Sequence, residues 1–241
     1  MPKVSVVMVG CPVKSDREPL GISTIVLIQG KFNTLYDVGT FATRQHVLNG
    51  LKAHGLTFGD IDRVILSHLH WDHALYVDPF REAEIIVSSK EHAQASDEKA
   101  RDGATPMFMV DILKGFKMKF PTEDEEIEPG VQLLETPGHT AGFLSAIVDD
   151  GAETHIIAGD ALPHACCLVS GVHERGWFSQ EMADRSMRKL GAMKGTIYPA
   201  HDRPFRYDAE TKAVNYLQPY SITFTCRFHA SGEATTVMVS S

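Results

Sequence analysis

The sequence has little cysteine and no long apolar run. Its four cysteines are Cys11, Cys166, Cys167 and Cys226, and they form no CxxC pair. Because vicinal cysteines are poorly placed to cross-link a fold, we expect reduced thiols rather than a disulfide framework. Cys166 or Cys167 could act as a ligand or a nucleophile, but their neighbours in the sequence supply no obvious activating arrangement. No stretch approaches the length of a membrane span.

Positive charge is also scarce. Against 31 Asp and Glu, the chain has 23 Lys and Arg, which gives a net charge of -8. This balance argues against a protein that binds nucleic acid phosphates, although it leaves room for a local basic patch. Residues 1–4 enter a strand pattern without the charged leader and apolar core of a signal peptide. We therefore expect a cytoplasmic protein with no membrane partner.

Apolar periodicity predicts alternating strands and helices in one domain over residues 1–241, made of two similar βα-rich halves. We predict strands at 4–9, 23–29, 33–36, 63–66, 84–88, 131–134, 144–148, 154–158 and 196–198. The helices are predicted at 44–55, at 89–95 with Ser89 as its cap, and at 184–194. Residues 96–120 are predicted to be irregular, and a β-hairpin around Ser231 and Gly232 is predicted at 221–239.

The most informative run is residues 67–73, Ser-His-Leu-His-Trp-Asp-His, directly after an apolar stretch. Residues two apart on an extended segment point the same way, so His68 and His70 can bind one ion. Asp72 and His73 must then point elsewhere, toward a second ion. Imidazole and carboxylate groups are ligands of divalent metals. A histidine-rich loop by chance is improbable with four ligands in this order, so the run predicts a metal site.

Three more candidate ligands follow predicted strands: His139 in TPGHT, Asp160 in AGDA and His201 in YPAHD. Each alone could be an ordinary turn or capping residue. Together they predict that one edge of a sheet sandwich holds two metal ions.

These motifs resemble the metallo-β-lactamase superfamily of binuclear hydrolases over residues of about 4–207. The HxHxDH motif of that family is matched by His68, His70, Asp72 and His73. The resemblance implies an α+β fold, the αβ/βα sandwich with two β-sheets face to face and helices outside. By the family pattern, one metal is held by His68, His70 and His139, and the other by Asp72, His73 and His201. Asp160 would bridge them, and Asp37, in the D-x-G turn, would brace the site from behind.

This resemblance implies a hydrolase with two divalent ions, most often Zn²⁺, with Fe or Mn also compatible. A hydroxide that bridges the metals would attack a carbonyl carbon or a phosphorus, with Asp72 as the catalytic group that orients it. We predict a small carbonyl substrate, such as a lactone, ester or amide. The alternatives are a phosphodiesterase or ribonuclease of the same fold, and a non-catalytic metal-binding protein. The Thr- and Val-rich terminal hairpin makes a homodimer a reasonable expectation.

The sequence HWDHA at residues 70–74 resembles the motif of the lactonase-like branch of the family. The sequence departs from it at residues 74–76, Ala-Leu-Tyr, and by lacking a tyrosine soon after Asp160. His164 or His173 could take the role of that tyrosine. A full set of seven ligands argues against a mononuclear iron dioxygenase, and glyoxalase II is disfavoured because its Cys-Gly-rich turn and basic tail are missing.

The run at 198–206 resembles an animal metallo-β-lactamase-domain protein linked to histone pre-mRNA processing. Arg203 and Arg206 beside a ligand could meet a phosphate, which keeps the nuclease alternative open.

Residues 104–118 and 162–178 are expected to line the substrate pocket. Aromatic side chains in these segments would favour an apolar or aromatic substrate, although the Met/Phe cluster at 107–116 could instead belong to the core. With the two histidines above, the predicted substrate-binding residues are Phe108, Phe116, His164, His173, Trp177 and Phe178.

Overall fold

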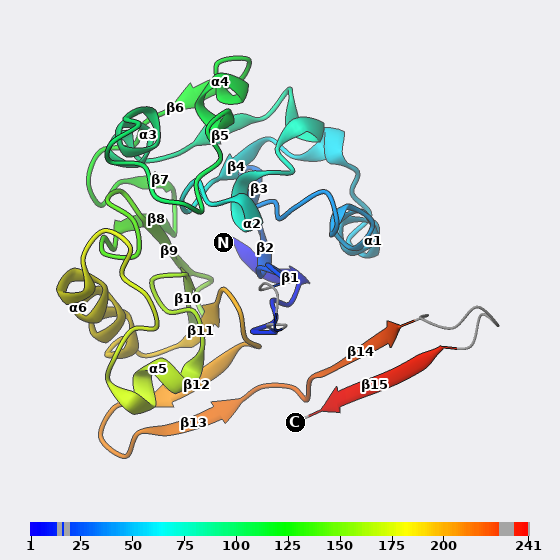
Figure 1. The fold of residues 1–241 in the computed structure, drawn as a ribbon, viewed down its shortest axis with the longest axis vertical. Helices are drawn as coiled ribbons and strands as arrows, with labels where there is room; N and C mark the ends of the chain where they lie inside the picture. The colour runs from blue at the N-terminus through cyan, green and yellow to red at the C-terminus, as the bar shows by residue number, and fades with distance from the viewer. Residues whose placement is uncertain (14–15, 17–19, 227–233, 241) are drawn as a thin grey trace.

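Two β-sheets face each other at the centre of the fold, and helices lie outside them (Figure 1). The computed structural model describes residues 1–13, 16, 20–226 and 234–240. The predicted α+β sandwich is confirmed. The first sheet has the order β1 (Lys3–Met8), β2 (Ile25–Gln29), β3 (Asn33–Tyr36), β4 (Arg63–Ile65), β5 (Glu84–Ile86) and β6 (Lys117–Lys119). Its strands β3 to β6 run parallel, as strands linked by helical crossovers do.

The second sheet is mostly antiparallel. Its order is β13 (Ala213–Tyr216), β12 (Phe205–Asp208), β11 (Thr196–Pro199), β10 (Thr154–Gly159), β9 (Leu144–Asp149), β8 (Val131–Glu135) and β7 (Glu126–Glu128). Only the β10–β11 pair of this described sheet is parallel. The helices are α1 (Arg44–Ala53), α2 (Trp71–Ala74), α3 (Ser89–Ser96), α4 (Met109–Leu113), α5 (Ala165–Ser170) and α6 (Gln180–Gly191), with short 3₁₀ turns at Phe58–Asp60 and Asp78–Phe80.

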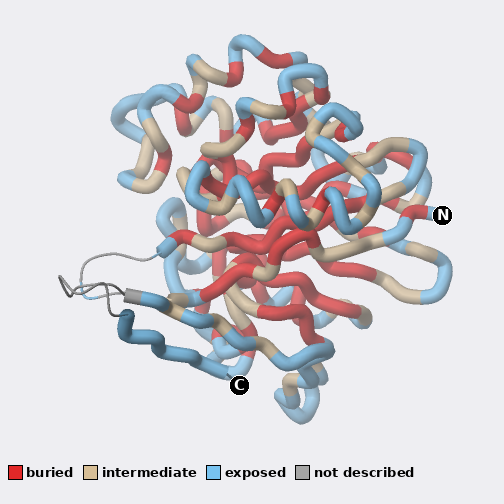
Figure 2. Tube along the Cα trace, turned by 90° about the vertical axis from the view of Figure 1, so that its right-hand side faces the viewer, coloured by how far each residue is buried: buried red, intermediate tan, exposed pale blue. Residues whose placement is uncertain are grey.

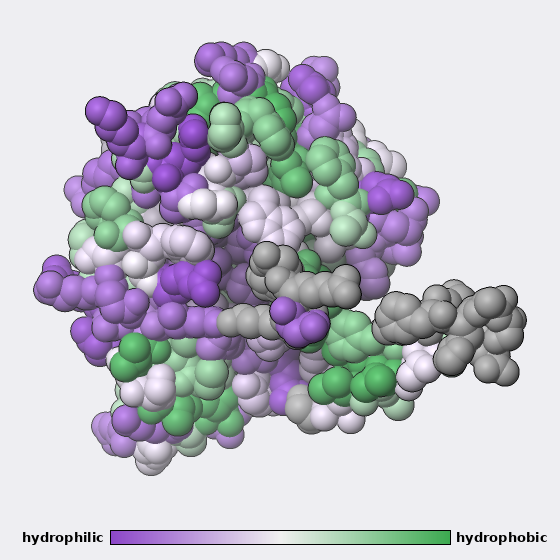
Figure 3. Space-filling view, in the orientation of Figure 1, coloured by the Kyte–Doolittle hydropathy of each residue, from purple (hydrophilic) through white to green (hydrophobic). Residues whose placement is uncertain are grey.

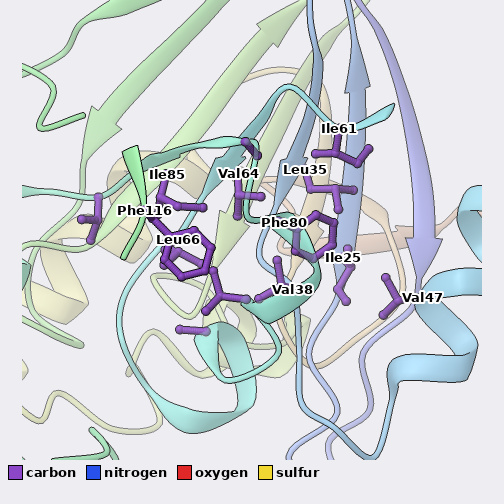
Figure 4. Close-up of a cluster of buried hydrophobic side chains, with 14 of the residues drawn as sticks. Ile25, Leu35, Val38, Val47, Ile61, Val64, Leu66, Phe80, Ile85 and Phe116 are labelled. Carbon is purple, nitrogen blue, oxygen red and sulfur yellow. The ribbon is translucent and has the colours of Figure 1, made fainter. Parts of the chain in front are cut away.

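Strand β2 shows how an apolar run builds the layered core on both of its faces. Its residues alternate sides: Ile25 and Leu27 pack under the outer helices, while Val26 and Ile28 pack between the sheets. A strand buried on both faces must be apolar throughout, which is why Ile-Val-Leu-Ile shows no polar alternation. Figure 4 shows the outer cluster around Ile25 and Leu35, and Figure 2 shows that the buried residues concentrate along the central strands.

Several predicted boundaries were wrong. The cap of α3 is Ser88, whose Oγ accepts from the Lys90 N–H at 3.2 Å, so the cap lies one residue before the predicted Ser89. Helix α6 begins at Gln180, four residues before the predicted start, because the Ser179 hydroxyl caps the Met182 N–H at 3.3 Å. The segment 96–120 contains α4 and β6 rather than only irregular chain. These elements are too short to show a period in the sequence.

Strands β14 (Ser221–Cys226) and β15 (Thr235–Ser240) pair antiparallel and form a small sheet of their own. They extend away from the sandwich in Figure 1. The predicted turn at Ser231 and Gly232 lies outside the described residues. Within the described chain, every helix is too short or too polar to cross a membrane.

Candidate metal centre

The histidine run changes conformation halfway along, and this change divides its ligands. After β4 the chain stays extended through His70, which has φ -66° and ψ 151° and is the N-cap of α2. The N–H groups of His73 and Ala74 both donate to the His70 carbonyl at 3.1 Å, which closes a helical turn. His68 and His70 therefore lie two apart on extended backbone, whereas Asp72 and His73 lie on the turn. The short helix α2 is absent from the prediction.

The first ligand group contains His68, His70, His139 and Asp160, all buried, with candidate ligand atoms within 4.8 Å of one another. His139 Nε2 lies 3.1 Å from His70 Nδ1 and 3.2 Å from Asp160 Oδ2. His139 comes from the loop after β8, and Asp160 follows β10. Strands of both sheets thus deliver this group to one point.

The second group contains Asp72, His73 and His201. Asp72 Oδ2 lies 3.7 Å from His73 Nε2 and 3.5 Å from His201 Nε2. Asp160 also reaches this group, since its Oδ2 is 3.3 Å from His73 Nε2 and its Oδ1 is 3.2 Å from His201 Nε2. The Asp160 carboxylate therefore lies between the two groups.

Each of these histidines has its outward ring nitrogen held by a polar partner. The pairs are His68 Nδ1 with Ser67 Oγ at 2.9 Å, His70 Nε2 with Asp102 Oδ2 at 3.0 Å, His73 Nδ1 with Asp37 Oδ2 at 2.7 Å, His139 Nδ1 with the Arg175 carbonyl at 2.9 Å, and His201 Nδ1 with the Ile22 carbonyl at 3.0 Å. Such partners orient an imidazole so that its other nitrogen faces the centre.

The nitrogen and oxygen atoms that face the centre show whether metal ions fit there. His68 Nε2, His73 Nε2 and Asp160 Oδ1 are buried without a hydrogen-bond partner. Burying polar atoms without partners is costly, and imidazole nitrogens beside carboxylates are the donor set of zinc and similar ions. The residues present therefore fit two divalent cations.

Burial and the charges of neighbouring residues shift the pKa values of the histidines at the centre. Burial, together with the neighbouring histidines, holds the pKa of His68 well below its usual value. Burial would also lower the pKa of His73, but the charges of Asp72, Asp160 and Asp37 raise it well above normal. Carboxylates thus outweigh desolvation on one side of the centre, where a cation would take the place of a proton.

Asp37 occupies the turn after β3 with a left-handed φ of 60°. Its carboxylate accepts from the Ser67 N–H at 2.8 Å and the Ser67 hydroxyl at 2.9 Å, besides contacting His73. Burial raises its pKa despite these contacts. Asp37 thus connects β3 to the histidine run, at the position expected from the D-x-G resemblance.

Two supporting carboxylates were missed in the sequence. Asp102 lies in the charged segment after α3, and its Oδ1 accepts from the Ala104 and Thr105 N–H groups at 2.9 Å, while Oδ2 faces His70. Burial would raise the pKa of Asp102, but hydrogen bonds from His70 and these amides lower it to about 2. Glu91, fully buried on α3, accepts from the Leu69 and Gly142 N–H groups. No motif marked either residue, because their partners are distant in the sequence.

A cavity of about 640 Å³ opens onto the centre. His164, His173 and Trp177 line it, as do His70, Asp72, His139, Asp160 and His201. Glu174 and Arg175 also line it and fall within the predicted segment 162–178, whereas Cys11 and Trp71 lie outside both predicted segments.

The other predicted pocket residues lie elsewhere. Phe116 is buried in the apolar core beneath Arg81, and Phe108 is exposed to solvent. Neither side chain lines the cavity. Phe178 faces a neighbouring pocket that shares Trp177. Arg206 pairs with Glu153 at 2.8 Å and Arg203 lies over the Tyr216 ring, and neither arginine lines the cavity.

Known proteins share the fold and part of the sequence. The profile of the metallo-β-lactamase superfamily matches residues 17–201. An N-acyl homoserine lactonase from a Bacillus species is 35% identical over 127 residues, which cover 50% of this chain and 48% of that relative. The chain therefore spans about half the length of this curated relative.

Two solved structures show the same architecture. A probable metal-dependent hydrolase from Staphylococcus aureus has a TM-score of 0.71 at 16% identity, covering 88% of this chain and 95% of the other. The dizinc quorum-quenching lactonase AidC, in complex with a product, has a TM-score of 0.63 at 20% identity, covering 81% and 79%. At these identities the structures establish the shared fold alone. The profile match, which covers more than half of the chain, shows that the chain belongs to the metallo-β-lactamase superfamily.

Proposed function

We propose that the chain is a binuclear metal-dependent hydrolase of small carbonyl substrates, with a lactone as the first candidate and esters or amides as the next. The observation that carries the proposal is the Asp160 carboxylate, which lies between two groups of histidines whose outward nitrogens are all held. Two ions bound there would supply an activated water and polarise a carbonyl group. The dizinc lactonase of the same fold supports zinc as the metal.

The chain's own residues would perform the remaining tasks. His68, His70 and His139 would hold one ion, Asp72, His73 and His201 the other, and Asp160 both. Asp72 lies at the cavity wall and would also orient the nucleophile. Trp71 and Trp177 line the same cavity and would offer apolar surface to a substrate. His173, whose Nε2 lies 2.7 Å from the Asp160 carbonyl, would keep the loop after β10 in place.

The proposal is tested by hydrolysis assays on the zinc-loaded chain with lactones, β-lactams, thioesters and single-stranded RNA. We expect lactone turnover that a chelator abolishes and zinc restores. His70→Ala, Asp160→Ala and His201→Ala should each lose most activity and much of the bound metal. His46→Ala is the matched control, because His46 is exposed on α1 outside both ligand groups. Full turnover and full metal content in Asp160→Ala would contradict the assignment of Asp160 as a metal ligand of the hydrolase.

The rival functions predict different assay results. A nuclease would cleave RNA in preference to lactones, but the net charge of -8 and the engagement of Arg206 with Glu153 disfavour it. A non-catalytic metal-binding protein would show no turnover on any substrate class. The cavity that reaches the ligands favours catalysis over a purely structural site.

We further propose that the chain forms a homodimer through the β14–β15 hairpin and works in the cytoplasm. A two-stranded hairpin is marginally stable alone, and Val237, Met238 and Val239 of β15 are all more than half exposed. Figure 3 shows hydrophobic surface where the hairpin lies. A second copy of the chain would cover this surface and pair its edges. The free thiols of Cys11, Cys166 and Cys167 suit a reducing compartment.

A further inference from the structure

A second cluster of metal-binding side chains lies beside the cavity, at the start of α5. His164 Nδ1 lies 2.8 Å from Cys166 Sγ and 3.3 Å from Cys167 Sγ. The ligand atoms of these three residues all fall within 4.8 Å of one another. None of the three belongs to either ligand group of the centre. The sequence neighbours of the cysteines had shown no activating arrangement, and the structure supplies one.

The histidine of this cluster is held in the same way as those of the centre. His164 Nε2 lies 2.7 Å from Glu174 Oε2, so one ring nitrogen contacts a carboxylate while the other faces two sulfur atoms. A histidine that binds a metal almost always has its other nitrogen held by a carboxylate, a carbonyl or water. Four of the five histidines of the centre show this pattern, and His164 repeats it with thiols in place of further imidazoles.

The backbone around the cluster is well anchored. His164 is the N-cap of α5, and the next N–H, of Ala165, donates to Asp202 Oδ2 at 3.2 Å. Cys167 is buried, which fixes its sulfur, whereas Cys166 is exposed and free to adjust. His164 and Glu174 also line the 640 Å³ cavity, so the cluster forms part of its wall.

We propose that His164, Cys166 and Cys167 bind a third metal ion of the thiolate-preferring class, for which Zn²⁺ is the expected ion. Imidazole and thiolate ligands select zinc or Cu(I) over harder ions such as Mg²⁺ or Mn²⁺. Three protein ligands leave a fourth position for water or for a substrate group from the cavity.

The distances between the ligand atoms of this cluster require only a small adjustment to bind zinc. A tetrahedral zinc site with standard bond lengths separates a nitrogen and a sulfur ligand by about 3.5 Å. The His164–Cys167 separation of 3.3 Å is already close to this value. The 2.8 Å separation to Cys166 must widen, and the exposed Cys166 side chain can rotate outward to allow it.

Metal binding at this cluster should release protons. A metal-binding imidazole must be neutral and a metal-binding thiol must be deprotonated. The ion therefore competes with protons for the imidazole and the thiols. Binding should strengthen as the pH rises.

The test is a Cd²⁺ titration of the full-length, zinc-loaded chain, followed by ultraviolet absorption from the thiolate-to-cadmium charge transfer. The centre contains no thiol, so this absorption reports on cysteine ligands alone. We expect a band that saturates at one Cd²⁺ per chain and disappears in the Cys166→Ser/Cys167→Ser double variant. Cys11→Ser is the matched control and should keep the band. Glu174→Gln should weaken Cd²⁺ binding about 10- to 100-fold.

A second measurement needs no variant. In the unmodified chain, Zn²⁺ should slow alkylation of Cys166 by a maleimide, and a chelator should restore the rate. Absence of the band, its persistence in the double variant, or an alkylation rate that zinc leaves unchanged would each overturn the site and leave an ordinary hydrogen-bonded thiol–imidazole pair. Neither readout involves hydrolysis, so its failure is distinct from a failure of the proposed function.

Discussion

Asp102 determines which nitrogen of His70 is available to a metal. Its Oδ1 is occupied by two backbone N–H groups, so its Oδ2 must accept from His70 Nε2 at 3.0 Å. His70 then carries its proton on Nε2 and presents a bare Nδ1, 3.1 Å from His139 Nε2. A single carboxylate thus selects the tautomer that a ligand needs.

We therefore predict that Asp102→Asn impairs the first metal site without unfolding the chain. If the new amide oxygen keeps the two backbone contacts, its NH₂ group faces His70 Nε2 and favours the wrong tautomer. Metal affinity should fall about 10- to 100-fold. Metal content after dialysis against a weak chelator measures the change.

Asp111→Asn is the control for this prediction, because Asp111 is exposed on α4 and pairs only with Lys114 among the contacts described. Equal metal retention by the two variants would contradict the role assigned to Asp102.

At the scale of elements, α3 holds together the two loops that supply the first ligand group. Its fully buried Glu91 accepts from the Leu69 N–H at 2.9 Å, between two histidine ligands, and from the Gly142 N–H at 3.3 Å, just after His139. The helix begins at a Ser88 cap that fixes Glu91 in the first turn. One side chain therefore couples the motif of the first half to a loop of the second.

Glu91→Ala should lower the free energy of unfolding by about 1–3 kcal/mol, because two buried N–H groups lose their acceptor. Chemical denaturation of the variant and of Glu98→Ala, an exposed control, measures the loss. A variant as stable as the control would show that water replaces the carboxylate without cost.

The same residue predicts a pH dependence. Burial raises the pKa of Glu91, so the folded chain keeps this proton to higher pH than the unfolded chain does. Its contribution to stability is then fully present below the unfolded pKa and decreases as the pH rises through the folded one. The stability difference between the wild type and Glu91→Ala should be larger at pH 5 than at pH 8. A difference that grows with pH would refute this sign.

At the scale of the whole molecule, the sandwich and the hairpin differ in how far their residues are buried. The sandwich buries strands such as β2 on both faces, whereas the hairpin leaves each described residue of β15 exposed. A chain with a well-packed sandwich and an exposed hairpin is suited to assembly through that hairpin.

Removal of residues 221–241 should therefore convert a dimer into a monomer while the metal centre keeps its ions. Every candidate ligand found among the described residues precedes this segment. Light scattering gives the mass of both forms. Val239→Asp should weaken the dimer in the full chain, and Lys212→Gln, on an exposed turn, should not. A full chain that is monomeric at all concentrations would refute the assembly.

The sequence by itself determined the fold class and the kinds of residue at the centre. Strands such as β2 and β3 were predictable because periodicity is local, and the histidine run was predictable because its ligands follow one another along the chain. His139, Asp160 and His201 could be found because each follows a strand, and strand ends meet at sheet edges.

Only the tertiary structure decided how these residues are supported. The partners of His70, Leu69 and His164 are Asp102, Glu91 and Glu174, which lie 32, 22 and 10 residues away along the chain. The structure also places Phe116 in the apolar core, whereas the sequence analysis expected it in the pocket wall. Orientation of a ring, burial of a carboxylate and the approach of a thiol depend on packing between separate segments, and no local pattern of residues encodes that packing.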